Sequence, residues 1–461
     1  MRPRWMLGIV LAAGAYATPA PTRSFPNILL VTIDTLRADH VSCYGYHLET
    51  TPVLDRLAAE GVRFARAYTT IPQTGPAHIS LFTSTYPQQH GSRINGVSYN
   101  AKARLLFLPQ VLRRYGYRTA AFVSAWPLIK RLTNLDVWFD DWDEQLDRRY
   151  QLFNTQRWAE DVTPRVTAWL HNTKHQPFFL WVHYFDPHEP YDLREAFARL
   201  KQVRAPALAN GPAVQDPEMQ ERVRAYDSEV AYADHYLGQL LSTLHRLGLA
   251  ERTIVVVLAD HGESLGEHNY VGHGRHLYEH IVQIPFIIRY PGVIPPGRVV
   301  REPVSLLDVM PTLLELALER NGESVHLPFP LEGKSLVPAL TGNGSLEPRT
   351  LYFLTYAGKK GFLPNWFARL WVDEDELPLR LGRVSGDSKV IWTPSEHRME
   401  LYELARDPEE LSPSLPVRTS PRYRSEQLRL ERWYRMTAGQ AGQLQLTEKD
   451  VQVLRSLGYL H

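Results

Sequence analysis

The sequence is short of cysteine, of long apolar runs and of any excess of one charge. A single cysteine, Cys43, stands among 461 residues, so no internal disulfide can form, and zinc or iron–sulfur sites built on several thiolates are excluded. The 51 basic side chains almost balance the 50 acidic ones, which gives no overall attraction to nucleic acid or to an anionic membrane. With 44% hydrophobic residues, the chain is too apolar for a disordered protein. We therefore expect a globular protein held together by its core.

The first 17 residues have the pattern of a secretory signal peptide. Arg2 and Arg4 precede a mostly apolar stretch, residues 5–17, which ends in small residues that resemble a cleavage site. This stretch is short for a membrane span, and no later stretch reaches about 18 uncharged apolar residues. We expect residues 1–17 to be removed and the protein to be periplasmic or secreted. An uncut N-terminal anchor is the alternative.

Short apolar runs alternate with helical patterns through residues 26–344, the expected catalytic domain. Ile28–Ile33 is a nearly continuous run of branched residues, typical of a buried strand in a mostly parallel sheet. Thr51 and Pro52 begin a helix that Gly61 ends. Further strands are expected at residues 62–68, 119–125, 178–185, 253–260 and 285–292, and further helices at 78–84, 216–247 and 304–317. This alternation predicts an α/β fold, with ligands bound beyond the carboxyl ends of the strands.

The pattern changes after about residue 344. Short apolar runs joined by turns predict a C-terminal α+β subdomain over residues 345–461, built on a small antiparallel sheet. Its strands are expected at residues 351–357, 361–372, 388–392 and 399–405. A surface loop is expected at Ser412–Pro421 and a terminal helix at Glu448–Leu457.

Polar side chains stand where several of the expected strands end. Asp34 follows the first strand, Asp260 and His261 follow TIVVVLA, and Thr74 lies in the loop TTIPQTGPA. A carboxylate that ends such an apolar strand is costly to bury unless it is paired or binds a metal. Two Asp, one His and a hydroxyl from separate loops can form a divalent metal site at one edge of the sheet.

Several segments resemble, in order, the blocks of the sulfatase-like branch of the alkaline phosphatase superfamily. They are VTIDTLRADHVSCYGY, TTIPQTGPAHISLFTSTYPQQHG, PFFLWVHYFDPHEPY, LADHGESLGEH and IPFIIRYPG, followed by VSLLDVMPTLLELA and MELYELARDPEE. The resemblance implies a mixed sheet between helices with a small C-terminal antiparallel sheet. It also implies a hydrolase that acts on sulfuric or phosphoric esters.

The nucleophile block departs from that family. Sulfatases carry C-x-P-S-R or S-x-P-S-R, whose first residue is oxidised to formylglycine, whereas residues 74–78 here read TGPAH. Threonine is not a known source of formylglycine, so none is expected. Thr74 is instead expected to join the metal and to attack as an activated hydroxyl. A threonine intermediate must be cleared by attack of water or another acceptor, which is the chemistry of the superfamily's phosphodiesterases and phosphotransferases.

The metal block departs as well. The family's Asp-Asp pair is Asp34-Thr35 here, and its Asp-Asn pair is Asp260-His261. We expect one divalent ion, held by Asp34, Asp260, His261 and Thr74. The imidazole ligand favours zinc or manganese, although calcium, as in sulfatases, stays possible.

Five other histidines are candidates by their positions in these blocks. His188, in DPHEPY, matches the family histidine that contacts the ester, with a loop-stabilising hydrogen bond as the alternative. His273 replaces a catalytic lysine, either holding the anion or protonating the leaving group. His78 stands where the family has arginine and is expected to orient Thr74. His183 and His276 are expected on the substrate side, with a buried structural role for His183 and a surface position for His276 as alternatives.

The expected partner is a small-molecule or glycan ester, with no nucleic acid and, after signal cleavage, no membrane; the oligomeric state is not inferred. Three other functions stay open. The chain could be a sulfatase that works without formylglycine, a phosphodiesterase or phosphotransferase, or a non-catalytic binding relative. The joint presence of Asp34, Thr74, Asp260 and His261 argues against the last.

Overall fold

The computed structural model describes residues 25–150, 153–198, 217–356 and 377–439, together with Lys449, Gln452 and Val453. The predicted signal peptide and the strand predicted at 361–372 lie outside these residues, as does the helix predicted at Glu448–Leu457 apart from those last three residues. None of the helices in these ranges has the length and the hydrophobicity that a transmembrane segment requires.

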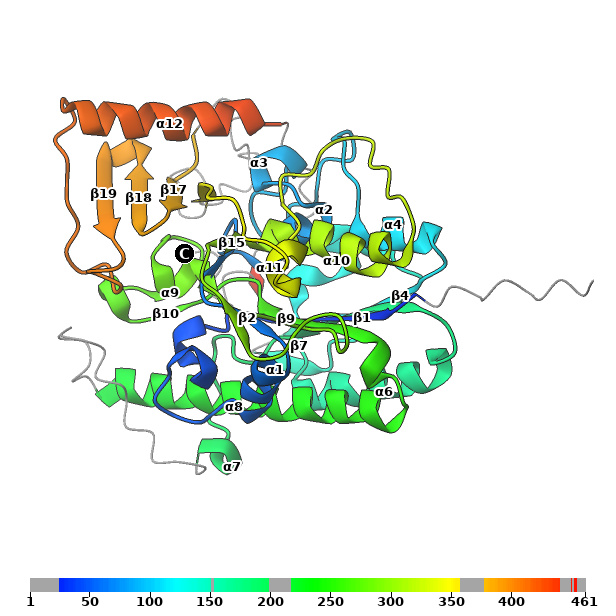
Figure 1. Ribbon diagram of the computed structural model, residues 1–461. Coiled ribbons are helices and arrows are strands. Elements are labelled where there is room, and N and C mark those ends of the chain that lie inside the picture. The colour runs from blue at the N-terminus through cyan, green and yellow to red at the C-terminus, as the bar shows by residue number, and fades with distance from the viewer. Residues whose placement is uncertain are drawn as a thin grey trace, which may run out of the picture.

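An eight-stranded mixed sheet forms the centre of the molecule (Figure 1). In spatial order its strands are β14 (Arg298–Val300), β2 (Val62–Phe64), β13 (Phe286–Arg289), β9 (Thr253–Ala259), β1 (Asn27–Ile33), β8 (Phe178–Tyr184), β4 (Arg118–Phe122) and β5 (Asp141–Asp143). β1 pairs in parallel with β8 on one side and with β9 on the other. The carboxyl ends of these three strands therefore meet at one edge of the sheet.

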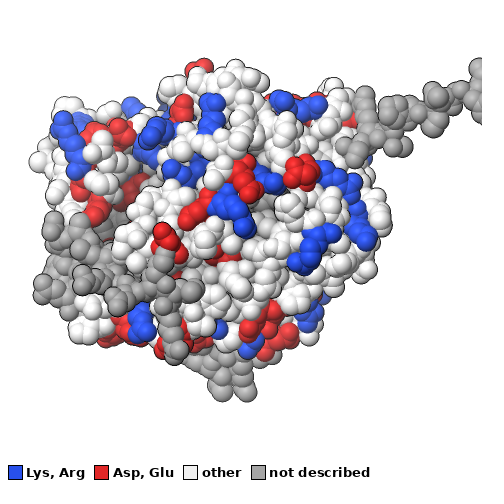
Figure 2. All heavy atoms as spheres, turned by 60° about the horizontal axis from the view of Figure 1, so that its bottom comes forward, with Lys and Arg blue, Asp and Glu red and all other residues white. Residues whose placement is uncertain are grey.

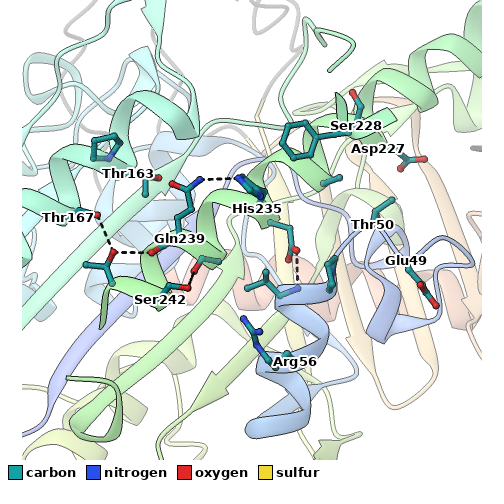
Figure 3. Close-up of a pocket in the computed structure, with 18 of the residues that line it drawn as sticks. Glu49, Thr50, Arg56, Thr163, Thr167, Asp227, Ser228, His235, Gln239 and Ser242 are labelled. Atoms are coloured by element: carbon teal, nitrogen blue, oxygen red, sulfur yellow. Dashed lines mark hydrogen bonds between the residues drawn. The ribbon is translucent and has the colours of Figure 1, made fainter. Parts of the chain in front are cut away.

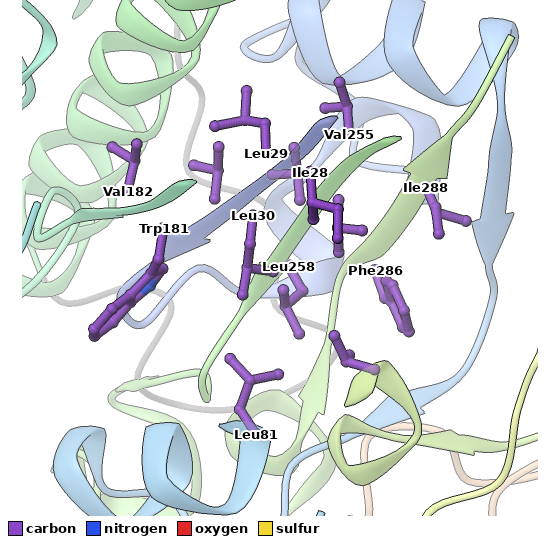
Figure 4. Packing of buried hydrophobic residues seen from close by; sticks show 14 of the residues in the cluster. Ile28, Leu29, Leu30, Leu81, Trp181, Val182, Val255, Leu258, Phe286 and Ile288 are labelled. Atoms are coloured by element: carbon purple, nitrogen blue, oxygen red, sulfur yellow. The ribbon is translucent and has the colours of Figure 1, made fainter. Parts of the chain in front are cut away.

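Helices cover both faces of the sheet. α1 (Pro52–Glu60), α6 (Ala159–Thr173) and α8 (Pro217–Arg246) lie on one face, and α2 (Thr74–Thr83), α4 (Leu108–Arg114) and α10 (Val309–Ala317) lie on the other. Every residue of β1, β8 and β9 is therefore buried, which explains their unbroken apolar runs. Figure 4 shows the alternation along β1, with Leu30 directed toward Leu81 of α2 and Leu29 directed to the opposite side.

Smaller elements complete the catalytic part. They are the three-stranded sheet of β12 (Gln283–Ile284), β3 (Ala67–Tyr68) and β15 (Val304–Ser305), the pairs β6 (Arg148–Tyr150) with β7 (Phe153–Gln156) and β10 (Ser264–Leu265) with β11 (Val271–Gly272), and the short helices α3 (Pro87–His90), α5 (Lys130–Thr133), α7 (Glu195–Ala198), α9 (Glu279–Val282) and α11 (Val337–Thr341). The strand predicted at 62–68 was wrong as one element, because β2 and β3 belong to different sheets. The helix predicted at 304–317 begins as β15, and α2 begins four residues before its predicted start.

A four-stranded antiparallel sheet forms the C-terminal part. Its strands are β16 (Leu351–Thr355), β17 (Arg380–Ser385), β18 (Ser388–Thr393) and β19 (Arg398–Glu403), and α12 (Pro421–Thr437) packs against it (Figure 1). The sequence did not predict β17 or α12. In α12 only Tyr423, Leu430 and Tyr434 are buried, so its apolar pattern is thin. We place the boundary between the two parts, as a proposal, at residues 342–344, where α11 ends.

The N-terminus of α1 is capped from α8 rather than by its own N-cap residue. The side chain of Asp234 accepts hydrogen bonds from the backbone N–H groups of Val53 and Leu54, each at 2.9 Å. Thr51, the predicted cap, makes no side-chain cap bond and instead accepts from the N–H of Ser42 at 3.0 Å. The cap therefore ties α1 to α8 across the helical layer.

Asp234→Asn should flatten the dependence of stability on pH. Burial raises the pKa of Asp234 to about 7, above the value of about 3.9 in an unfolded chain. The folded state then binds more protons, so the stabilising contribution of Asp234 is complete below about pH 4 and is lost as the pH rises to about 7. We expect the free energy of unfolding of the wild type to fall over this window by up to about 4 kcal/mol more than that of the variant. Urea unfolding at about pH 4 and about pH 7 measures this free energy in both proteins. An equal change between the two pH values in the wild type and the variant would contradict the prediction.

Candidate active site

Two buried carboxylates and an imidazole meet where β1 and β9 end. Asp34, Asp260 and His261 each offer a possible ligand atom, and these atoms lie within 4.8 Å of one another. All three residues are fully buried. Nε2 of His261 lies 3.4 Å from Oδ2 of Asp260 and 3.8 Å from Oδ1 of Asp34. The structure thus brings together the three protein residues, other than Thr74, that the sequence predicted as metal ligands.

Hydrogen bonds determine how His261 faces the two carboxylates. Its Nδ1 lies 3.0 Å from the carbonyl oxygen of Gly262, an acceptor, so Nδ1 carries the ring proton. In the neutral ring the lone pair of Nε2 is then directed at Asp34 and Asp260, the arrangement found in metal-binding histidines. Oδ1 of Asp260 accepts from the backbone N–H groups of Thr35, at 3.3 Å, and of His261, at 2.9 Å, which leaves Oδ2 facing the group.

This group lacks the positive charge that its burial requires. Among the described residues, neither oxygen of Asp34 nor Oδ2 of Asp260 has a hydrogen-bond partner. Burial and the neighbouring charge of Asp260 raise the pKa of Asp34 well above its usual value. A divalent cation would neutralise both carboxylates and accept the lone pair of His261. Two carboxylates and an imidazole suit zinc or manganese, so the residues present fit one such ion.

Thr74 is the first residue of α2 and lies beside the group formed by Asp34, Asp260 and His261. Its Oγ1 lies 3.5 Å from Nε2 of His261, and the residue is fully buried. The N-terminus of a helix carries partial positive charge, which favours an anion or an alkoxide at this position. His78, one turn later, donates from Nδ1 to the carbonyl oxygen of Thr74 at 2.7 Å and accepts at Nε2 from the hydroxyl of Thr32 at 3.0 Å. His78 therefore holds the backbone that presents Thr74.

His273 stands on the more exposed side of the group. Its ring centroid lies 4.5 Å from that of His261 and 5.1 Å from that of His188. Its Nδ1 donates to Oε1 of Glu263 at 2.9 Å, and the other oxygen of Glu263 accepts from the hydroxyl of Tyr191. His273 is 9% exposed, whereas His261 is fully buried and His188 is 3% exposed. It is therefore the histidine best placed to exchange protons with solvent.

The remaining predicted histidines have distinct surroundings. His188 donates from Nδ1 to the carbonyl oxygen of Glu189, and burial lowers its pKa to about 3, so its ring is neutral. Nδ1 of His183 accepts from the N–H of Ser124 at 3.4 Å, which places the ring proton on Nε2, 3.4 Å from Oδ2 of Asp34. His183 therefore contacts Asp34, a predicted metal ligand. The ring of His276 contacts residues outside this group, with centroid distances of 4.6 Å to Tyr270 and 5.4 Å to Tyr278.

Sequence reasoning gave Glu263 no role. The signal that could have pointed to it is its position three residues after Asp260 in the same loop, DHGES. Its carboxylate is 1% exposed, and burial raises its pKa above the ordinary value. Only the tertiary contact with His273 shows what it holds.

A large cavity elsewhere in the molecule takes no part in this arrangement. It measures about 1050 Å³ and lies between α1, α6 and α8 (Figure 3). None of the predicted site residues lines it. Figure 2 shows the face of the molecule that lies at the bottom of Figure 1, with basic and acidic side chains interspersed over it. The residues of the candidate site lie apart from this cavity, at the edge of the sheet where β1 and β9 end.

The mixed sheet between two helical layers, with its small C-terminal sheet, has the alkaline-phosphatase-like α/β fold that was predicted from the sequence. Residues 26–319 match the family model "Sulfatase". The chain belongs to the sulfatase family and is a hydrolase of that family, which confirms the family and the fold predicted from the sequence.

The relatives agree with this membership. The chain is 27% identical to "Uncharacterized sulfatase YidJ" of Escherichia coli K12 over 84% of its length and 82% of that protein. It is 24% identical to the N-acetylglucosamine-6-O-sulfatase of Bacteroides thetaiotaomicron, with the same two shares covered. The solved structure of the phosphonate monoester hydrolase of Agrobacterium radiobacter has the same fold, with a TM-score of 0.64, 21% identity, and 89% of this chain and 95% of that chain covered.

Proposed function

We propose that the protein is an exported, metal-dependent hydrolase of sulfate or phosphate-type esters that uses the hydroxyl of Thr74 as its nucleophile. One observation carries the proposal. Oγ1 of Thr74 lies at a helix N-terminus, 3.5 Å from Nε2 of His261, and the lone pair of that nitrogen faces two buried carboxylates without a countercharge. Asp34, Asp260 and His261 would hold one divalent ion. Sulfatases among the relatives support an ester of a sugar or another small alcohol as substrate.

A metal ion held there would supply positive charge beside the Thr74 hydroxyl and the oxygens of the ester. Thr74, having lost its proton to solvent, attacks sulfur or phosphorus through Oγ1. The bond to the ester oxygen breaks, and the leaving alcohol takes a proton from His273, whose protonated ring is stabilised by Glu263. Water then attacks the covalent intermediate and returns a proton to His273. The products are the alcohol and the inorganic anion, and Thr74 is restored.

Threonine at this position favours phosphorus as the reacting atom. A formylglycine hydrate can expel sulfate with its second hydroxyl, whereas threonine has one hydroxyl and depends on displacement by water. Displacement of this kind is the ordinary route for phosphoryl groups. A phosphodiesterase or phosphotransferase is therefore the second candidate function, and the likeness in fold to a phosphonate monoester hydrolase is compatible with it.

Hydrolysis of matched aryl sulfate, phosphate monoester and phosphodiester substrates by the manganese- or zinc-loaded protein tests the proposal. Turnover that requires the metal is the expected result, and the preferred substrate decides between sulfur and phosphorus. Absence of turnover on all three substrates would overturn the proposal and favour a non-catalytic binding protein.

Glu263→Gln should lower kcat by about 10- to 100-fold with little change in KM. The glutamine keeps the shape of the side chain but loses the charge that stabilises protonated His273, so we expect it to forfeit part of the roughly 10²- to 10⁴-fold contribution of a general acid. Steady-state kinetics on the best of the three substrates measures it. Glu267→Gln is the matched control, because Glu267 pairs with Arg37 at 2.6 Å. A loss of kcat that is equal in both variants would show a general structural effect and contradict the role of Glu263.

A further inference from the structure

Unsatisfied hydrogen-bond donors gather on the loop that follows α3. Arg93 is 1% exposed and Asn95 is 2% exposed. In the described part of the chain, Nε and Nη1 of Arg93 and Nδ2 of Asn95 have no hydrogen-bond partner. Among the described residues, the guanidinium of Arg93 donates from Nη2 to the carbonyl oxygen of Gly439, at 3.0 Å, and lies over the ring of Tyr356, whose centroid is 5.4 Å away. Neither contact supplies negative charge, and a buried cation without an anion is costly.

This loop packs directly against the N-terminus of α2. Oδ1 of Asn95 accepts from the backbone N–H of Gly75 at 2.8 Å, and the N–H of Asn95 donates to Oε1 of Gln73 at 2.8 Å. Gln73 and Gly75 are the two neighbours of Thr74. A Cβ atom on Gly75 would lie 3.2 Å from Oδ1 of Asn95, so glycine allows this close approach. Asn95 is therefore held beside the proposed nucleophile.

The ring that Arg93 contacts leads to the other side of the candidate site. Thr355, which precedes Tyr356, donates a hydrogen bond to the carbonyl oxygen of Gly274. Gly274 follows His273, the proposed proton donor. The loop of Arg93 and Asn95 thus contacts the nucleophile segment directly, through Gly75. It is connected to the segment of His273 indirectly, through Tyr356 and Thr355.

Two kinds of buried polar atom near the N-terminus of α2 lack hydrogen-bond partners among the described residues. The acceptors, on Asp34 and Asp260, call for a cation, and the donors, on Arg93 and Asn95, call for an anion. A guanidinium can bind two oxygens of a tetrahedral oxyanion at once, and the α2 N-terminus adds partial positive charge.

We propose that Arg93 and Asn95, with the N-terminus of α2, form the subsite for the anionic sulfate- or phosphate-type group of the substrate. This inference rests on the proposed function and deepens it.

The affinity of the metal-loaded full chain for inorganic sulfate and for inorganic phosphate, measured by titration calorimetry, tests the subsite. Arg93→Gln removes the charge, and Asn95→Asp keeps the size and the acceptor for Gly75 while replacing the donor with negative charge. We expect each variant to bind the anions at least about tenfold more weakly, since a hydrogen bond to a charged group is worth at least that factor. Arg383→Gln, which removes a buried arginine paired with Glu426 at 2.6 Å, should leave the affinity unchanged.

Thermal unfolding shows whether each variant is folded. If Arg93→Gln does not fold, the anion affinity of Asn95→Asp tests the subsite. Affinities of folded variants within about twofold of the wild type would overturn the subsite. Turnover of the wild type is measured separately. If the wild type turns over its ester and both variants bind anions normally, this inference alone is refuted. If the wild type shows no turnover but both variants lose anion binding, the subsite is supported and the proposed function is refuted.

Discussion

Thr74→Ala is expected to abolish ester hydrolysis, with kcat/KM reduced by at least about 10⁴-fold, the scale on which enzymes lose activity when their nucleophile is removed. Alanine keeps the backbone of α2 and the hydrogen bond from His78 to the carbonyl oxygen of residue 74, so binding of the metal and of anions should persist. Thr74→Ser is the matched control, because it retains a hydroxyl at the same atom. It should keep turnover within about 100-fold of the wild type.

Acid-quenched reactions give a second measure of the same role. Intact-mass analysis should detect a sulfuryl or phosphoryl adduct on the wild type and on Thr74→Ser, and none on Thr74→Ala. If Thr74→Ala retained a few per cent of the activity, or if Thr74→Ser were as inactive as the alanine variant, the hydroxyl would not be the nucleophile.

Asp34→Asn is expected to change the stability of the protein in opposite directions with and without metal. In the chelated protein the substitution removes a buried carboxylate whose oxygens have no hydrogen-bond partner among the described residues, so the variant should be more stable than the wild type by about 1–2 kcal/mol. With metal present the order should reverse. A ligand affinity weakened by about 100-fold forfeits about 2.7 kcal/mol of linked stabilisation.

Denaturant unfolding in chelator and in excess manganese or zinc measures the free energy of unfolding without and with metal. Asp227→Asn is the control, because Asp227 is equally buried but accepts hydrogen bonds from His40, at 2.7 Å, and Tyr46, at 2.5 Å. That variant should be less stable than the wild type under both conditions. An Asp34→Asn variant that is destabilised in chelator, or that is stabilised by metal as much as the wild type is, would show that Asp34 is not a ligand.

The strand ends were the most informative positions in the sequence. An apolar run such as Ile28–Ile33 predicts a strand buried on both faces, and the residue after it is then placed at the carboxyl edge of a parallel sheet. For this reason Asp34, Asp260 and His261 could be expected to meet even though they are far apart in the chain. β17 and α12 were missed because their apolar positions are few.

The roles of the individual histidines could not be predicted in this way. His183 and His261 both follow or end apolar strands, yet one directs a proton at Asp34 and the other a lone pair. The difference comes from their Nδ1 partners, the N–H of Ser124 and the carbonyl oxygen of Gly262. These partners are set by packing between neighbouring segments, which no local pattern reports.

The sequence by itself determined the alternation of strands and helices, the membership of the sulfatase family, and the residue types at the ends of β1 and β9. Those properties depend on hydrophobic period and on residues close together in the chain. Only the tertiary structure decided which nitrogen of His261 is free to bind a cation, which carboxylate supports His273, and that Arg93 and Asn95 carry buried donors beside Thr74. The reason is that the protonation and the satisfaction of a buried polar group depend on all the atoms around it, and most of those atoms come from distant parts of the chain.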